Sequence, residues 1–357
     1  MQVTKEIKRD YAIDLWRLIL SILVVIGHAT YYSISTKYGG MYINDEMTAA
    51  GIQLTMVRKI TNAVTSLIYG FHMPAFFVIS GIIFARQLEK GKFQNGKELI
   101  KNKAERLLIP YIFVWLVWNM PIKIISGYYE NLKKPLVSVM CQILDPYCVY
   151  LWFLPALFFD FLLVYYLRKY IKSETVQFCL LCLLFAIGIL IGRCNMQPLG
   201  NPFKYAIWLW LGTKMDVFCK RYLRNINSAV YGIMYLVLWG ICYMRDVLWE
   251  GILYQTIIPL IGTLFLYGIS KDLILWNSEQ IIKMVGRCNK YTLGLYLWAE
   301  PLNYLIMEKC ADIWGIQIFA SEIITAIIYI IRILGTSAIA VFIVHLLKKV
   351  KFGIKVY

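Results

Sequence analysis

Two ionisable side chains interrupt an apolar stretch near the start of the chain. Residues 11–33 read YAIDLWRLILSILVVIGHATYYS and contain Arg17 and His28, eleven positions apart. In an α-helix, eleven residues turn by about 1100°, so both side chains lie on one face, about 16 Å apart along the axis. Asp14 lies one turn before Arg17 on a neighbouring stripe. Intramembrane polar residues usually face a bundle interior or a wet cavity, so the stretch predicts a polar channel across the membrane. The alternative is that Asp14 and Arg17 anchor the helix at the headgroups, with His28 a hydrogen-bonded core residue.

A second histidine lies in the segment FHMPAFFVISG, residues 71–81. His72 comes two residues before Pro74, and a proline removes a backbone donor and loosens the helix around it. Histidine can act as a general base near neutral pH. A buried, hydrogen-bonded histidine in a kinked helix is the competing interpretation. The third histidine, His345, lies at the end of the last apolar stretch, where we expect it at the interface.

Lys103 and Arg106 lie in the segment KNKAERLLIPY, at the start of another apolar stretch. They are three residues apart and therefore share a helix face. Two cations so placed could bind phosphate groups, whereas the simpler interpretation is a solvated basic flank. Other charges fall within predicted spans, and the sequence does not say which of them pair: Asp160, Lys214, Asp216, Glu300 and Arg332.

The composition is that of an all-α integral membrane protein. Of 357 residues, 60% are hydrophobic and only 16% are charged, whereas a soluble domain carries about 25% charged residues. The net charge of +16 is explained by cytoplasmic loops rich in lysine and arginine, which face anionic headgroups, and not by nucleic acid. The first apolar stretch carries charges and no cleavage-site pattern follows it, so we interpret it as a retained span.

We expect about ten transmembrane helices forming a single domain over residues 1–357, without a soluble domain. Their predicted ranges are 11–34, 60–85, 107–126, 148–167, 175–192, 205–219, 227–244, 252–270, 291–308 and 321–346. Alternating the sides from a cytoplasmic start, with Lys5, Lys8 and Arg9, leaves most of the 37 lysines and arginines on the inner side. This is the pattern that the positive-inside rule requires, and it predicts that both termini are cytoplasmic.

Several catalytic signatures are absent from the sequence. There is no G-x-S-x-G elbow, P-loop, dinucleotide glycine cluster or H-E-x-x-H, so a serine-hydrolase or ATP-driven mechanism has no support and no metal site is predicted. The nine cysteines include Cys179 and Cys182, which lie inside an apolar run and are expected in the core. Cys141 and Cys148 flank a loop and could pair if that loop is extracytoplasmic; the sequence leaves this open.

The motifs together resemble the membrane-bound acyltransferase 3 family. The resemblance rests on D-L-W-R…V-V-I-G-H with Arg17 and His28, FHMPAFFVISG, KAERLLIPY, WFLPALF (152–158) and YTLGLYLWAEP (291–301), in the family's order over nearly the whole chain. It implies a ten-helix enzyme that moves an acyl group, usually acetyl, from cytoplasmic acyl-CoA to a hydroxyl, commonly of a cell-surface glycan. It also implies a bacterial plasma membrane as the setting.

The resemblance assigns roles residue by residue. Arg17, His28 and His72 inherit the motif's catalytic positions, and Lys103 with Arg106 matches the basic pair, although a lysine replaces a frequent arginine. Relatives often carry a histidine in a late Y-L-x-H-x-P pattern, and here Ala299 stands in its place, followed by Glu300. Glu300 is a candidate substitute, and Asp14 a supporting residue. The 357 residues contain no extracytoplasmic hydrolase-like domain, which some relatives use to finish the transfer.

A mechanism follows as a hypothesis, with acetyl-CoA or another acyl-CoA as co-substrate. Its phosphates would bind Lys103 and Arg106, and the pantetheine arm would follow the face between Arg17 and His28. His28 would deprotonate the acceptor hydroxyl, and His72 or Arg17 would stabilise the oxyanion.

The alternative is a transporter that exports a glycan or a lipid-linked sugar, because kinked spans and intramembrane charges are common to both classes. A scaffold role would need no polar residues in the first helix. The sequence does not identify the acceptor, distinguish acetyl from succinyl, or indicate an oligomeric state.

Overall fold

A computed structural model describes residues 10–130, 133–142, 145, 150–222, 227–245, 251–276, 278–354 and 356. The basic residues Lys5, Lys8 and Arg9, and Cys148 of the possible cysteine pair, lie outside this part of the chain. The helices are α1 (Tyr11–His28), α2 (Ile43–Ala49), α3 (Met56–Tyr69), α4 (His72–Glu89), α5 (Gly96–Lys103), α6 (Ile109–Val114), α7 (Met120–Ile125), α8 (Pro135–Gln142), α9 (Phe153–Tyr170), α10 (Glu174–Arg193), α11 (Gln197–Tyr222), α12 (Ser228–Met244), α13 (Ile252–Gln255), α14 (Ile257–Trp276), α15 (Ser278–Cys288), α16 (Thr292–Trp298), α17 (Glu300–Trp314) and α18 (Glu322–Lys349).

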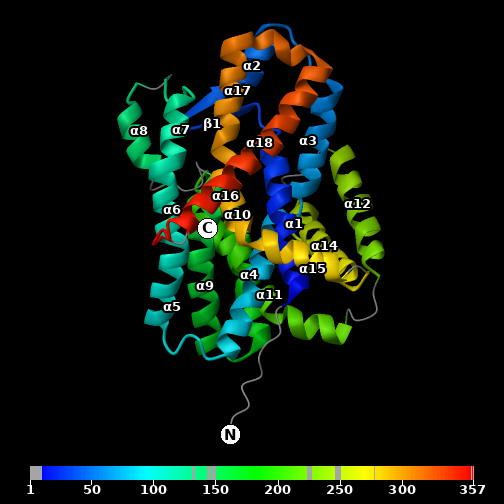
Figure 1. Ribbon diagram of the computed structural model, residues 1–357. Helices are drawn as coiled ribbons and strands as arrows, with labels where there is room; N and C mark the ends of the chain where they lie inside the picture. The colour runs from blue at the N-terminus through cyan, green and yellow to red at the C-terminus, as the bar shows by residue number, and fades with distance from the viewer. Residues whose placement is uncertain are drawn as a thin grey trace.

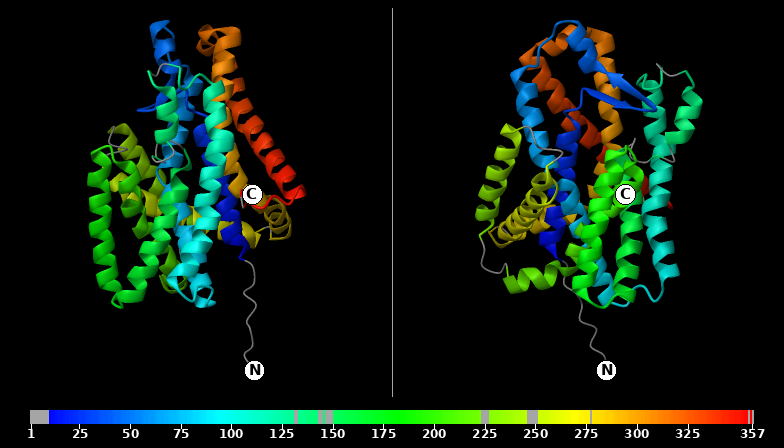
Figure 2. Two further views of the ribbon diagram at one scale, coloured as in Figure 1. Left: turned by 90° about the vertical axis from the view of Figure 1, so that its left-hand side faces the viewer. Right: turned by 180° about the vertical axis from the view of Figure 1, so that it is seen from behind.

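Helix α1 runs through the interior of the bundle and packs against α3, α4, α14, α16 and α18 (Figure 1). Its first turn is fixed by Asp10, whose carboxylate accepts a hydrogen bond from the Ile13 N–H and pairs with Arg86 at 3.0 Å. Such a cap satisfies one of the N–H groups that a helix start leaves without a partner. The views in Figure 2 show α9, α10 and α11 together on one flank and α18 on another. The residues of α1 therefore face neighbours from most of the chain.

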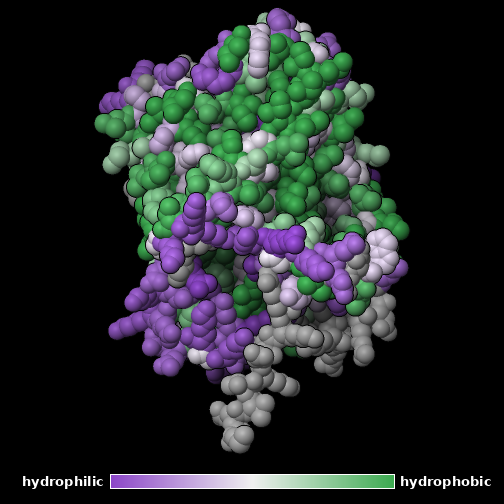
Figure 3. All heavy atoms as spheres, viewed as in Figure 1, coloured by the Kyte–Doolittle hydropathy of each residue, from purple (hydrophilic) through white to green (hydrophobic). Residues whose placement is uncertain are grey.

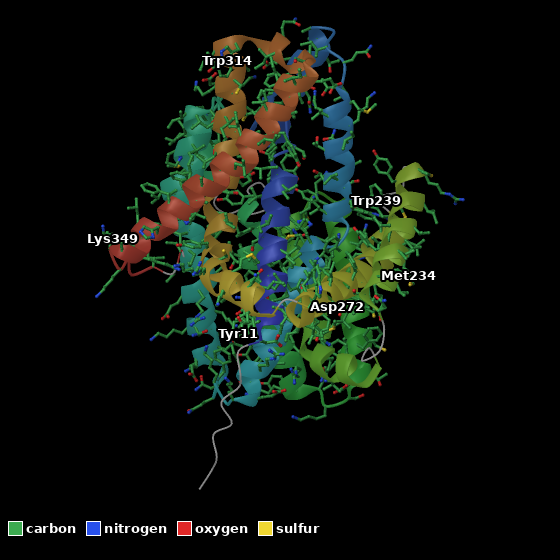
Figure 4. The ribbon with its side chains drawn as sticks, turned by 45° about the vertical axis from the view of Figure 1, so that its right-hand side comes forward. Tyr11, Met234, Trp239, Asp272, Trp314 and Lys349 are labelled. Atoms are coloured by element: carbon green, nitrogen blue, oxygen red, sulfur yellow. The ribbon has the colours of Figure 1, made fainter. Side chains whose placement is uncertain are left out.

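The outer surface is that of a multi-pass membrane protein. Apolar residues cover much of the upper part in Figure 3, while hydrophilic residues gather at the lower end and in a belt over α15 and the end of α18. Figure 4 shows Tyr11 near the lower end and Trp314 at the opposite end. Among the described residues, seven helical segments are long and apolar enough to cross a membrane. Each of the ten predicted stretches overlaps a helix, but α12 has only 17 residues, and the count of ten spans stays a prediction.

The first helix ends earlier than we predicted, at His28 instead of residue 34. The residues that follow are β-branched, aromatic and glycine residues, which favour extended chain and turns. They form an antiparallel hairpin, β1 (Ser33–Thr36) and β2 (Gly39–Tyr42), with Ser33 opposite Tyr42. The Gly40 N–H donates to the Tyr128 carbonyl at 3.0 Å, which ties the hairpin to the end of α7. The hairpin and α2 thus occupy much of the chain between the first two predicted spans.

The predicted second helix is divided into α3 and α4 at Gly70 and Phe71. We predicted a kink at Pro74, and the break lies just before it. Pro74 thereby occupies the first turn of α4, where a backbone N–H has no intrahelical partner and its absence costs nothing. Hydroxyl groups satisfy carbonyls at the end of α3: Tyr254 donates to Ser66 at 3.0 Å, and Tyr235 donates to Leu67.

A second break, at Ala299, separates α16 from α17 within the predicted ninth helix. Pro301 has no N–H, so the Leu297 carbonyl four residues earlier loses its helical donor. The Tyr150 hydroxyl donates to that carbonyl, and the Trp118 indole N–H donates to the next one, Trp298, at 2.9 Å. The proline thus determines where Tyr150 is held. The chain between the eighth and ninth predicted spans is also largely helical, because α14 extends to Trp276 and α15 covers Ser278–Cys288.

Glycines allow α4 and α11 to approach at backbone distance. A Cβ atom on Gly81 would lie 2.0 Å from the Leu209 carbonyl oxygen, and one on Gly212 would lie 2.2 Å from that of Val78. In a membrane, such small-residue contacts replace the hydrophobic effect as a cause of helix association. This contact fixes α4, which carries His72, against α11.

We expect Gly81→Ala to destabilise the protein by about 1–3 kcal/mol, because the added methyl group forces the two backbones apart. Gly240→Ala is the matched control, since a Cβ atom there has no neighbour within 4 Å and alanine favours a helix. The thermal unfolding midpoint in detergent should fall by several degrees for the first variant and not for the second. Equal midpoints for the two variants would contradict the packing argument.

Candidate functional site: two adjoining cavities

Two histidines and five tyrosines line the larger cavity, of about 800 Å³, which we call the histidine cavity: His28, His72, Tyr31, Tyr69, Tyr150, Tyr205 and Tyr296. His28 is the last residue of α1 and His72 the first residue of α4, so both stand at helix ends. The structure therefore brings together the two histidines that the sequence singled out.

The Tyr69 ring is a neighbour of both histidines. Its ring centroid is 4.6 Å from that of His72 and 6.3 Å from that of His28. The Tyr31 hydroxyl donates to the Tyr69 hydroxyl at 2.7 Å. A Cβ atom on Gly27 would lie only 2.5 Å from the Tyr69 ring, so the glycine before His28 lets this ring approach α1. The two imidazoles thus share one aromatic neighbour.

Arg332 holds the end of α1 in place. This α18 residue is 1% exposed, and its guanidinium donates to the Tyr31 carbonyl at 2.6 Å, the His28 carbonyl at 3.3 Å and the Asn303 side-chain oxygen at 3.0 Å. A helix end leaves carbonyls without intrahelical partners, and a cation is favoured there by the helix dipole. The sequence left the partners of Arg332 open; the structure assigns them to the backbone around His28.

The three cations of the sequence motifs line a second cavity, of about 300 Å³, which we call the cationic cavity. Arg17, Lys103 and Arg106 lie on its wall with Ser21, Thr292 and apolar residues. Arg106 belongs to a π-helical turn, Ala104–Leu108, that precedes Pro110. Because Pro110 cannot donate to the Arg106 carbonyl, the helix widens at this point, as helices often do at functional sites.

Lys103 and Arg106 are not equivalent within the cationic cavity. Arg106 is exposed, whereas Lys103 is buried, with its ammonium 3.5 Å from the ring centroid of Phe161 and near the rings of Phe84 and Phe93. Its ammonium also donates to Gln87 at 3.5 Å. Aromatic rings attract a cation through their negative faces. Lys103 is thus held among rings, and Arg106 is the more accessible cation.

The two cavities adjoin at Met73 and Tyr296, which line both of them. The Tyr296 hydroxyl donates to the Tyr150 backbone carbonyl at 2.8 Å, which fixes this part of the wall. Arg17 and His28, on one face of α1, therefore line two cavities that meet at Met73 and Tyr296. A ligand that binds the cations and reaches past Tyr296 would present its far end to the histidines.

Two of the predicted site residues line neither cavity. Asp14 is half-buried on the first turn of α1. Glu300 is buried behind the wall, where its carboxylate accepts a hydrogen bond from the Tyr304 hydroxyl. Glu300 is also an electrostatic neighbour of Tyr150 and Tyr296. It lies in the layer behind the histidine cavity and does not take the place of a histidine within it.

Sequence reasoning missed the tyrosines of the histidine cavity and the role of Arg332. One signal was present: Tyr69 is three residues before His72, which is the spacing of a shared helix face. Tyr150 and Tyr296 are both more than seventy residues from either histidine, and no local pattern links them. The chain contains 26 tyrosines, so residue type alone does not identify the five that line the cavity.

The protein is a bundle of apolar helices around two adjoining cavities, one lined by cations and the other by histidines. This arrangement is that of a membrane protein with a site for two chemical groups. A family model described as an acyltransferase domain matches residues 10–345. The chain belongs to this family, the acyltransferase 3 family that the motifs resembled.

One curated relative is the nodulation protein NolL of Mesorhizobium japonicum, with 27% identity over 158 residues. That alignment covers 44% of this chain and 35% of NolL. The chain thus matches about a third of the length of this relative. No solved structure matches the chain.

We expect Arg332→Gln to lower acyl transfer at least tenfold, because the carbonyls of His28 and Tyr31 lose their charged donor and the end of α1 moves. Hydrogen bonds to charged groups contribute about 1.5–3 kcal/mol each. Arg245→Gln, at the exposed end of α12, is the control. Rates in purified protein and thermal midpoints should fall together for Arg332→Gln only. Unchanged transfer in Arg332→Gln would refute its positioning role.

Proposed function

We propose that this protein is a membrane acyltransferase that takes its acyl group from acyl-CoA, most simply acetyl-CoA, and transfers it to a hydroxyl of a cell-surface glycan or lipid-linked sugar. The donor would bind in the cationic cavity and the acceptor in the histidine cavity. We further propose that the cationic cavity faces the cytoplasm of a bacterial plasma membrane, with both termini on that side.

One observation carries the proposal: the cavity with three cations adjoins the cavity with two histidines. Phosphate groups prefer arginine and lysine partners. A general base must lie close to the hydroxyl whose proton it removes. Arg17 and His28 are eleven residues apart, about 16 Å along the helix, which roughly matches the reach of the pantetheine arm. A thioester carbonyl would then lie near Met73 and Tyr296, where both ligands can meet.

The reaction needs one base and one group to support the developing oxyanion. The His28 imidazole takes the proton of the acceptor hydroxyl while the oxygen attacks the thioester carbonyl. The carbon–sulfur bond then breaks, the ester forms, and the CoA thiolate leaves and is protonated by the His28 imidazolium or by water. His72 supports the oxyanion from within the same cavity. Arg17, on the wall of the cationic cavity, is better placed for the donor than for the oxyanion.

The decisive experiment uses detergent-purified full-length protein and radiolabelled acetyl-CoA without an acceptor. We expect saturable binding and slow release of acetate, which His28→Ala lowers by about 10²–10⁴-fold, the range typical of a lost general base. His345→Ala is the matched control, since His345 is exposed on α18 and lines neither cavity. Full activity of His28→Ala would contradict its role.

Absence of binding to both acetyl-CoA and succinyl-CoA would overturn the donor assignment. The transporter alternative would then be tested by glycan flux across vesicles, which acyl transfer does not require. Binding of one donor only would identify the acyl group.

We expect Arg106→Gln and Arg17→Gln each to raise the Kd for acetyl-CoA about tenfold, because each removes a charge-assisted hydrogen bond to phosphate. Lys101→Gln, an exposed residue of α5 outside the cavity lining, is the control. Calorimetry in detergent measures the Kd. The affinity of wild type should also weaken with salt, as it does for ion pairs that remain open to solvent. Equal Kd values for all three variants would separate this cavity from donor binding.

A further inference from the structure

The histidine cavity has a second wall, formed where α10 ends and α11 begins. Gln197, Asn201 and Lys204 lie on it at positions i, i+4 and i+7, which is one face of α11. Arg193, the last residue of α10, lies on the same wall. This side of the cavity is therefore polar and cationic, and the acyl-transfer scheme above does not use it.

Close packing of α10 against α11 fixes this wall. A Cβ atom on Gly188 would lie 2.6 Å from the Lys204 backbone nitrogen and 2.7 Å from the Gly200 carbonyl oxygen. The two backbones therefore touch beside Lys204, as in other small-residue contacts between membrane helices. Gly192, one turn later and also on the cavity wall, has open space at its Cβ position. The position of Lys204 is thus set by backbone contact.

The two cations on this wall have no protein counter-charge. No aspartate or glutamate lines the histidine cavity among the described residues. Lys204 is half-buried with its ammonium 5.7 Å from the Tyr205 ring centroid, and Arg193 is exposed. Neither side chain forms an ion pair or a hydrogen bond within the part of the chain that the structure describes. By contrast, Lys214 on the same helix pairs with Glu174.

We propose that Arg193 and Lys204 form a subsite for an anionic group on the acceptor, so that the acceptor is an acidic sugar bearing a carboxylate or a phosphate. This inference rests on the proposed function. A cation within a membrane protein normally has a partner, and here the ligand supplies it. Gln197 and Asn201 add neutral donors and acceptors for sugar hydroxyls. The positive end of the dipole of α11, at Gln197, favours an anion in the same place.

A binding experiment tests the subsite without any donor. Purified full-length protein is heated with glucuronic acid, glucose 1-phosphate or methyl glucoside, at equal concentration and at an ionic strength matched with sodium chloride. We expect one or both acidic sugars to raise the thermal midpoint, and the neutral glucoside to leave it unchanged. The glucuronic acid and glucose phosphate arms tell a carboxylate from a phosphate. Lys204→Gln and Arg193→Gln should each abolish most of the shift, while Lys214→Gln, the matched control on α11, retains it.

A kinetic experiment then places the subsite in the reaction. With radiolabelled acetyl-CoA and the acidic sugar that binds, Lys204→Gln should raise the acceptor KM about tenfold, in line with the loss of a charge-assisted hydrogen bond. The corresponding kcat should change much less, because the lost contact is remote from the reacting atoms. Lys204→Arg should have a KM close to that of wild type, since a guanidinium also binds carboxylate and phosphate.

Two results would overturn the inference. One is that wild type responds equally to acidic and neutral sugars. The other is that Lys204→Gln weakens acetyl-CoA binding while its response to acidic sugars stays intact, because the anion would then belong to the donor. Failure of the proposed function has a different signature: wild type would not bind acyl-CoA at all, and the thermal experiment would still decide whether the anion subsite exists.

Discussion

Every backbone carbonyl inside a membrane needs a donor, and this requirement organises the molecule. An unbroken helix supplies all its donors from within, but the chain interrupts its helices at three places around the histidine cavity. Arg332 supplies donors at the end of α1, Tyr235 and Tyr254 at the end of α3, and Tyr150 with Trp118 between α16 and α17. Side chains from distant parts of the sequence thereby hold the breaks together.

The breaks place functional groups where a continuous helix would not. His28 and His72 stand at a helix end and a helix start, and both rings contact Tyr69. Within an unbroken helix, each imidazole would project from a continuous cylinder of apolar side chains. Because α1 ends at His28 and α4 begins at His72, the imidazole nitrogens and nearby backbone polar groups come together at the histidine cavity. The cost of each break is offset by hydrogen bonds from side chains, and one of these donors, Tyr150, also lines the cavity.

Much of this arrangement could be predicted from the sequence, and the limits have physical causes. Helical period placed Arg17 and His28 on one face and grouped Lys103 with Arg106, because such patterns are local. The sequence did not reveal that α1 ends at His28, because the Arg332 contact that holds this end spans about three hundred residues. It also did not reveal that Glu300 lies behind the wall, since burial of a carboxylate depends on tertiary neighbours. The number of spans and the sidedness remain predictions from charge and hydropathy.

The tyrosines at the helix breaks have a consequence for sequence variation. Phenylalanine is normally the mildest replacement for a buried tyrosine, because the ring keeps its volume. At Tyr150 and Tyr235 the hydroxyl is the donor for a main-chain carbonyl next to a break, so the same replacement leaves a buried acceptor without a partner. At these positions the exchange of tyrosine for phenylalanine is a drastic change, and drift between the two residues is restricted there while it stays free on the lipid-facing surface.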